Sequence, residues 1–352
     1  MKKITLTLGA LVLIAVSSCS VYKNDPFKGQ RIEPSVITDK TNHDTDDPAL
    51  WIHPERYDQS LIIGTDKDTD GGLFVYDLNG KLQNKVLGLK RPNNVDVQYG
   101  IPFQGKKVDI AVVTERELNQ IRIYSLPEMT EIGVIPVFEG EALRAPMGIA
   151  LYKNHTNDKF YLIVGRKEGP SGTYLWQYEL KEKDGKISGE VVRKFGEFSG
   201  KKEIEAIAVD HELGYIYYSD EQFGIHKYYA DPEKSNESLA VFGQNDFKED
   251  MEGISIYTQK DGKGYILVSN QQAGTFNVYP REGSSKSPHE HSLIVEIPVS
   301  TKFSDGSEVS SKALSIRYPK GLFVAMSEGK VFHYYDFRDL EAWIEKAKQT
   351  AP

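Results

Sequence analysis

The sequence predicts an all-β fold, a six-bladed β-propeller, and three observations lead to this prediction. From about residue 45 onward, apolar runs of about five to eight residues alternate with clusters of turn residues. The runs are rich in β-branched and aromatic side chains, which favour strands. They also come in pairs that repeat roughly every fifty residues. Helical periodicity is convincing only over Leu340 to Lys348, at the C-terminal end.

Each repeat contains a hairpin whose first strand ends in a small or polar residue and whose second strand ends in or near a tyrosine. The six hairpins span residues 61–78, 109–126, 161–180, 215–229, 265–279 and 322–335. Self-similar β units of this kind are typical of a propeller, which protects its strand edges by radial closure. A pair of packed sheets would explain the strand content but not six matched hairpins. We therefore assign residues 41–352 to one propeller domain.

The segment before the propeller is typical of a targeting sequence followed by a tether. Two lysines precede an apolar stretch, Ile4–Val16, which is too short to span a bilayer comfortably. Small residues then lead to Cys19, and this resembles a bacterial lipobox, in which cleavage before the cysteine leaves it to carry a lipid. An ordinary signal peptide with an incidental cysteine is the alternative. We expect a signal peptide over residues 1–18, a tether over 19–40, and an exported protein anchored by lipid to the bacterial cell envelope, at the outer membrane or the cell surface.

Charge, cysteine content and motifs exclude several classes of protein. The 352 residues include 43 Lys and Arg against 51 Asp and Glu, a net charge of −8, so no nucleic-acid partner is expected. The single cysteine excludes an internal disulfide framework and a cysteine-rich zinc module. The sequence contains no P-loop, dinucleotide fingerprint, nucleophile elbow or H-E-x-x-H motif. His289-Glu290-His291 lies in a loop rich in Ser and Pro, where a solvated segment is the expected interpretation.

Polar residues at matching hairpin turns indicate a site at one mouth of the propeller. Loops at one end of the channel converge, so that distant sequence positions can build a single site. The matching positions hold Lys67, Arg116, Lys167, Glu221 and Gln271. Any one of the basic residues alone is more often a solvated turn charge. Three in register, in an acidic protein, would present positive charge to an anionic ligand.

Carboxylates cluster just before several of the predicted inner strands. They are Asp46 and Asp47, Glu203 and Glu205, Asp250 and Glu252, and Asp305 and Glu308. Oxygen ligands in loops, without a set of cysteines or histidines, suit Ca²⁺ rather than zinc. In an extended segment, the alternation of Asp250 and Glu252 aims both side chains in the same direction. Surface acidity remains the simpler explanation for any isolated pair.

Further segments share their order and spacing with one known family. They read DDPALW, TDKDTDGGLFVYDLNGK, NNVDV, KKVDIAVVTER, VGRKEG, DMEGISIY, DGKGYILVSNQ and SDGSEV followed by KGLFVAMSEG, and they extend from about Asp46 to Tyr335. Together they resemble the β-propeller phytases. The resemblance implies a six-bladed propeller that uses several Ca²⁺ ions to hydrolyse phosphate monoesters of phytate (myo-inositol hexakisphosphate) or other inositol phosphates.

The resemblance also implies a role for each matched residue. Metal-ligand positions fall on Asp47, Glu205, Glu221, Asp250, Glu252, Gln271 and Asp305. Substrate-contacting positions fall on Lys67, Arg116, Lys167 and Glu221. The implied catalytic set consists of Glu205, Asp250, Glu252 and Lys67. In such a site the metals neutralise phosphate charge and lower the pKa of a bridging water, which attacks phosphorus in line without a covalent enzyme intermediate.

Three segments depart from the family pattern. Met147 stands where the family commonly has a tyrosine that contacts phosphate, and methionine cannot donate that hydrogen bond. Ser310-Ser311 replaces a second acidic position that follows Asp305 in the family, and residues 41–45 also match poorly. These differences bear on substrate affinity and on the number of bound calcium ions.

Two other classes of function fit part of the pattern. A binding propeller would capture anions at the same funnel without turnover. A six-bladed calcium lactonase hydrolyses its substrate at a propeller mouth, but it uses one catalytic metal and has no use for three matched cations. We therefore expect a monomeric phosphomonoesterase of the phytase type.

Overall fold

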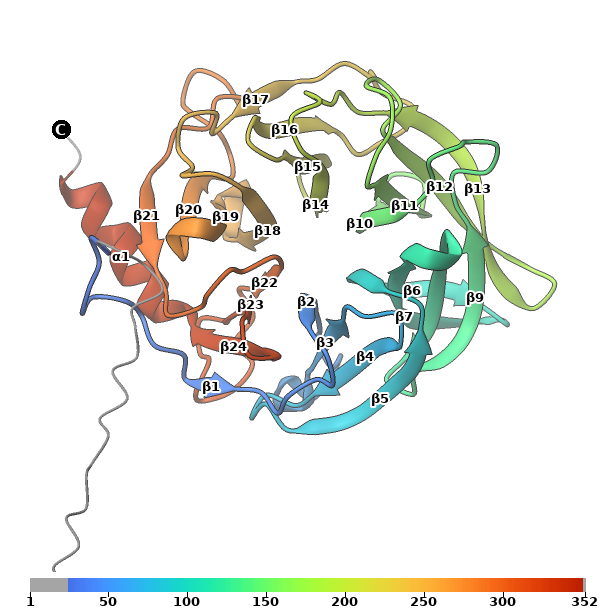
Figure 1. The fold of residues 1–352 in the computed structure, drawn as a ribbon, viewed down its shortest axis with the longest axis horizontal. Helices are drawn as coiled ribbons and strands as arrows, with labels where there is room; N and C mark the ends of the chain where they lie inside the picture. The colour runs from blue at the N-terminus through green and yellow to red at the C-terminus, as the bar shows by residue number, and fades with distance from the viewer. Residues whose placement is uncertain (1–24, 351–352) are drawn as a thin grey trace, which may run out of the picture.

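The computed structural model describes residues 25–350, and over this range the chain forms an all-β propeller whose sheets stand around a central axis (Figure 1). Four of these sheets have four strands each, and one has eight. The eight-stranded sheet consists of two four-stranded halves, which join through a single parallel bridge between Ile187 and Gly133.

Each four-stranded unit is made mainly of consecutive strands, and its innermost strand lies at the channel. The first unit contains β2 (Thr45–Trp51), β3 (Leu61–Asp66), β4 (Gly71–Tyr76) and β5 (Leu82–Leu89). The eight-stranded sheet contains β6 (Pro92–Phe103), β7 (Lys106–Glu115), β8 (Gln120–Leu126) and β9 (Thr130–Pro136), and then β10 (Pro146–Asn154), β11 (Lys159–Arg166), β12 (Leu175–Lys183) and β13 (Lys186–Phe195). The next two sheets contain β14 (Ile204–Asp210), β15 (Tyr215–Asp220), β16 (Gly224–Tyr229) and β17 (Ala240–Phe242), and then β18 (Met251–Thr258), β19 (Gly264–Asn270), β20 (Thr275–Pro280) and β21 (Val295–Pro298).

The last sheet joins the two ends of the propeller. It contains β22 (Ser307–Ser310), β23 (Leu322–Ser327), β24 (Val331–Asp336) and, at its outer edge, β1 (Val36–Ile37). β1 pairs with β24 in antiparallel register, and Ile32 bridges Val299. The propeller therefore begins before residue 41, within the range expected to be the tether. Cys19 and the predicted signal peptide lie outside the described residues.

The predicted C-terminal helix is confirmed. α1 (Phe337–Thr350) follows β24 directly. Its residues Phe337, Leu340 and Ile344 are buried in one apolar cluster that also contains Ile297 of β21. This amphipathic face explains why the helical period is visible in the sequence. No helix of residues 25–350 is both long and apolar enough to cross a membrane.

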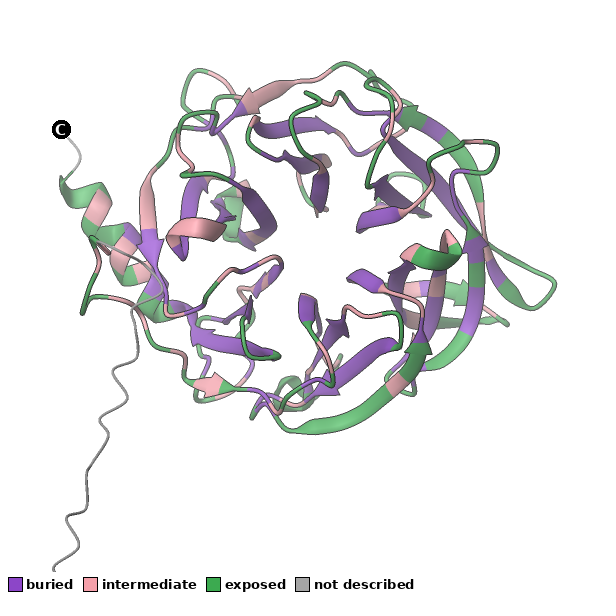
Figure 2. Ribbon diagram, in the orientation of Figure 1, coloured by how far each residue is buried: buried purple, intermediate pink, exposed green. Residues whose placement is uncertain are grey.

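Burial depends on a strand's position within its sheet (Figure 2). β4 and β19 are buried along their whole length, whereas most of β5, an outer strand, is exposed. Apolar clusters span adjacent sheets; one of them combines Leu73 of β4 with Val113 of β7. Middle strands therefore read as continuous apolar runs because neighbouring sheets cover both of their faces.

Candidate active site

A repeated backbone hydrogen bond places the five matched turn residues at one end of the propeller. The first residue after the second strand donates its N–H to a carbonyl just before the innermost strand. The pairs are Lys67 to Asp44 (2.6 Å), Arg116 to Arg91 (3.1 Å), Lys167 to Ala145 (2.8 Å), Glu221 to Glu203 (3.0 Å) and Gln271 to Asp250 (3.2 Å). The turn positions that the sequence aligns are therefore structurally equivalent.

A β-bulge near the start of the innermost strands brings a second set of side chains to the same end. The register shifts occur between Thr45 and Pro48, Pro92 and Val95, Pro146 and Ile149, Ile204 and Ile207, and Met251 and Ile254. A bulge breaks the alternation of a strand and redirects its side chains, and bulges are over-represented beside active sites. The first residues inside these bulges are Asp46, Asn93, Met147, Glu205 and Glu252.

Two groups of carboxylates within residues 25–350 have the spacing of a metal site, and they share Glu221. In each group, one oxygen from every member lies within 4.8 Å of the others. The groups are Glu203, Glu205 and Glu221, and Glu221, Asp250 and Glu252. Oε1 of Glu221 and Oε2 of Glu252 are buried and accept no hydrogen bond from the protein. Unpartnered buried carboxylate oxygens are costly, so these atoms fit a hard cation such as Ca²⁺.

Burial and like charge shift the protonation of this cluster. Burial raises the pKa of Glu205 to about 7, and the nearby Asp305, Glu203 and Glu221 add to the shift. Burial likewise raises the pKa of Glu221 to about 7, although the ammonium group of Lys202 opposes it. Burial, followed by the charges of Glu205 and Glu221, raises the pKa of Glu252 well above its ordinary value. A bound cation would relieve this repulsion.

The pKa of Asp250 shifts in the opposite direction because three side chains donate hydrogen bonds to its carboxylate. Burial alone would raise its pKa, but donors from Lys202, Gln222 and Gln272 outweigh burial and lower it. The three donors lie 2.8, 2.9 and 2.7 Å from the carboxylate oxygens, respectively. Asp250 is therefore held ionised at the edge of the cluster.

Lys67 connects the cluster to the first sheet. Its Nζ donates to Asp46 at 2.8 Å and to Asp305 at 2.9 Å, and Gln271 donates to the other oxygen of Asp305 at 2.5 Å. Burial opposes the charged form of Lys67, but the carboxylates of Asp46, Asp305 and Glu205 prevail and raise its pKa. The predicted residues Lys67, Gln271 and Asp305 thus form one connected network.

The other two predicted cations lie on the neighbouring sheets. Arg116 contacts the sulfur of Met147, the residue that departs from the family pattern. Its Nε is buried and has no hydrogen-bond partner in the protein. Lys167 is more exposed and donates to Glu203 at 2.9 Å. Both residues are therefore available at the rim of the cluster, with Met147 beside the guanidinium group.

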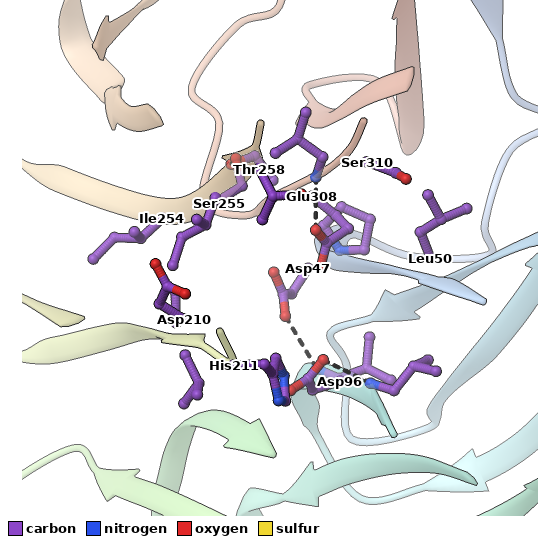
Figure 3. A pocket seen from close by; sticks show the side chains of 18 of the residues that line it. Asp47, Leu50, Asp96, Asp210, His211, Ile254, Ser255, Thr258, Glu308 and Ser310 are labelled. Atoms are coloured by element: carbon purple, nitrogen blue, oxygen red, sulfur yellow. Dashed lines mark hydrogen bonds between the residues drawn. The ribbon is translucent and has the colours of Figure 1, made fainter. Parts of the chain in front are cut away.

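Asp47 belongs to neither of the two carboxylate groups. Its Oδ2 accepts the backbone N–H of Val95 on β6 at 3.1 Å, and it lines a channel cavity of about 410 Å³. Figure 3 shows Asp47, Asp96 and Glu308 among the side chains that line this cavity. Asp46, one position earlier, is the residue that bonds Lys67. Of the carboxylates expected to bind metal, Asp47 and Asp305 belong to neither carboxylate group, and Asp305 is joined to Lys67 by a hydrogen bond.

Glu203, which the sequence analysis grouped with Glu205, is a member of the first carboxylate group. Sequence reasoning missed three residues around the cluster: Lys202, and Gln222 and Gln272, which donate to Asp250. The expectation that His289-Glu290-His291 is solvated is wrong for His291. This histidine is buried, its Nδ1 lies 2.7 Å from the carbonyl oxygen of Pro280, and its Nε2 lies 3.2 Å from Lys227 Nζ. Its buried neighbour comes from a different strand, β16, which local composition does not reveal.

Comparison with known proteins adds a family to this geometry. A family model described as Phytase matches residues 2–333. The chain belongs to the phytase family. It is also 29% identical over 342 residues to a 3-phytase from Bacillus subtilis (strain 168), covering 90% of this chain and 84% of that protein. These matches identify the protein as a phosphoric monoester hydrolase, and they support phytate hydrolysis as the activity of its family.

Solved structures with a similar backbone show the fold alone. Hydrazine synthase from Kuenenia stuttgartiensis aligns with a TM-score of 0.52 and 10% identity, covering 82% of each chain. A luciferin-regenerating enzyme aligns with a TM-score of 0.50 and 12% identity, covering 85% of this chain and 95% of that one. At such low identity the likeness carries no information about the phytase site.

Proposed function

We propose that this phytase hydrolyses phytate or related inositol phosphates in a calcium-dependent reaction at the carboxylate cluster. The observation that carries the proposal is the sharing of Glu221 by two groups of carboxylates, with buried oxygens on Glu221 and Glu252 that lack partners. An all-oxygen donor set of this kind suits calcium. Together with Glu221, Glu203 and Glu205 would bind one calcium ion, and Asp250 and Glu252 would bind a second.

The residues around the cluster have separable roles in the proposed reaction. When bound, calcium would supply positive charge to the phosphate and activate the attacking water. Lys67, fixed by Asp46 and Asp305, would hold one phosphate of a densely phosphorylated substrate beside the cluster. Arg116 and Lys167 would hold the neighbouring phosphates of the same substrate from the rim, as their position at equivalent turns suggests.

We also propose the finer features of the architecture and its cellular setting. The propeller would count six blades, one for each innermost strand, β2, β6, β10, β14, β18 and β22. The protein would be exported as a monomer and anchored through a lipid on Cys19 to the bacterial envelope, at the outer membrane or the cell surface. Neither the binding-only propeller nor the calcium lactonase is favoured by the family match.

Phosphate release from phytate tests the proposal. The soluble chain that begins after Cys19 would be assayed with calcium and with EGTA. Calcium-dependent release is the expected result. A folded protein that releases no phosphate with calcium, or that releases it equally well in EGTA, would contradict the proposal.

A further inference from the structure

Lys202 places a positive charge inside the carboxylate cluster. Its Nζ lies 2.5 Å from Oε2 of Glu221, 2.8 Å from Oδ2 of Asp250 and 4.0 Å from Oε1 of Glu252. These three carboxylates are the members of one of the two metal-like groups. The ammonium group therefore lies where a cation held by that group would lie.

The loop that carries Lys202 is fixed to the same strand end as Glu221. Ser199 donates its N–H and its hydroxyl to the carboxylate of Asp220, at 2.6 and 2.7 Å. Asp220 is the last residue of β15 and directly precedes Glu221. The backbone of the loop thus holds Lys202 close to the cluster. Its side chain is 37% exposed, whereas those of Glu221 and Glu252 are 0% and 2% exposed, so the ammonium group has a route to solvent.

A calcium ion and this ammonium group need the same oxygens. Calcium binds oxygen ligands at about 2.3–2.6 Å, close to the distance at which Lys202 contacts Glu221. Two cations at one position repel each other strongly, so both cannot contact Glu221 and Asp250 together. The lysine stem is flexible and can carry the charge outward.

We propose that Lys202 is an internal competitor for the divalent cation at Glu221, Asp250 and Glu252. It neutralises the carboxylates when the metal is absent, and it withdraws toward solvent when the metal binds. This role rests on the proposed function of the site. Because only the withdrawn state accepts the ion, Lys202 lowers the apparent metal affinity and thereby raises the calcium concentration at which the site fills.

The neighbouring Lys201 offers a matched control. Its Nζ donates to the backbone carbonyl of Gln222 at 2.8 Å and lies 5.5 Å from the centre of the Phe223 ring. Replacing it removes the same charge from the same loop. A general effect of net charge would appear in both variants, whereas direct competition would appear only at Lys202.

Calorimetric titration of calcium into metal-free protein tests the proposal. The Lys202→Met variant should bind calcium roughly tenfold more tightly than the unmodified protein. Lys201→Met and Lys202→Arg should bind with the unmodified affinity, since the first keeps the competitor and the second restores a cation. Without calcium, Lys202→Met should also unfold at a lower temperature than the unmodified protein. Added calcium should raise the unfolding temperature of the variant by more than it raises that of the unmodified protein. If Lys202→Met does not fold, Lys202→Gln serves the same comparison, because it is uncharged.

The outcomes separate this role from the function on which it rests. Unchanged or weaker calcium affinity in a folded Lys202→Met protein would overturn the competitor role. If the unmodified protein still released phosphate only with calcium, the proposed function would stand. If neither protein bound calcium, the competitor role and the calcium dependence of the proposed function would both fail.

Discussion

The carboxylates at the mouth of the propeller and those inside the channel differ in how their oxygens are hydrogen-bonded. In the channel, Asp47 accepts the N–H of Val95, and Asp96 accepts the N–H groups of Val97 and Leu151. At the mouth, Oε1 of Glu221 and Oε2 of Glu252 accept no hydrogen bond from the protein. A carboxylate paired with the backbone holds neighbouring strands together. Under the proposed function, a buried carboxylate oxygen without a protein donor would bind a cation, so the contrast would separate structural carboxylates from functional ones.

Of the changes at the mouth and in the channel, Glu221→Gln should lower activity the most, because Glu221 belongs to both carboxylate groups. Phosphate release from phytate should fall by about 100-fold or more, a loss of the size seen when a key charge-stabilising group is removed. Steady-state assays at saturating calcium would measure it. Circular dichroism should show an intact fold, and activity close to that of the unmodified protein would argue against the shared position.

Lys67→Ala should weaken phytate binding by about tenfold, the value of one charge-assisted hydrogen bond. KM should rise less for a simple monoester than for phytate, because the role of Lys67 is to hold a densely phosphorylated substrate. Comparing the two substrates in one assay separates binding from folding. An equal loss on both would contradict a phosphate-holding role.

Asp96→Asn is the matched change in the channel and should alter stability rather than activity. The carboxylate accepts the N–H groups of Val97 at 2.6 Å and Leu151 at 2.7 Å, and an amide cannot replace both acceptors. The free energy of unfolding should fall by about 1–3 kcal/mol. Urea denaturation would measure this loss. A large drop in the activity of the folded variant would contradict a purely structural role for Asp96.

The mouth should also give the metal-free protein a pH-dependent stability. Glu205 and Glu221 have ordinary pKa values of 4.5 and values of about 7 in the folded protein, mainly through burial. The folded state then binds more protons than the unfolded state between these values, so stability falls as pH rises from about 4.5 to about 7. Thermal unfolding across this range would show it, and calcium should flatten the slope. If calcium left the pH dependence of stability unchanged, that dependence would come from the carboxylates in the channel instead.

The regular parts of the fold could be predicted from the sequence. Strands that pair with distant segments, and strands whose side-chain alternation is broken by a bulge, could not. The hairpins and α1 could be predicted because their apolar periods are local. β1 could not, since a two-residue strand is defined by its partner β24, far away in sequence. The contact of Asp46 with Lys67 could not be predicted either, because the bulge at β2 is not visible in the residue pattern. The repeat itself held a usable signal, since Asp46, Glu205 and Glu252 occupy equivalent positions.

Lys202 escaped prediction for a different reason. It lies in a loop next to Lys201, and nothing in the local sequence distinguishes the two lysines. Only the fixed position of the loop on Asp220 and the approach of β18 bring Lys202 to Glu221 and Asp250. Sites assembled from several sheets depend on contacts of this kind.

Calcium located by its anomalous scattering in crystals of this protein tests most directly the central distinction between mouth and channel. The account predicts ions on both sides of Glu221, one toward Glu203 and Glu205 and the other toward Asp250 and Glu252, with Lys202 turned outward. Ions bound only by Asp47, Asp96 and Glu308 in the channel, with the carboxylates at the mouth still paired to Lys202, would contradict it.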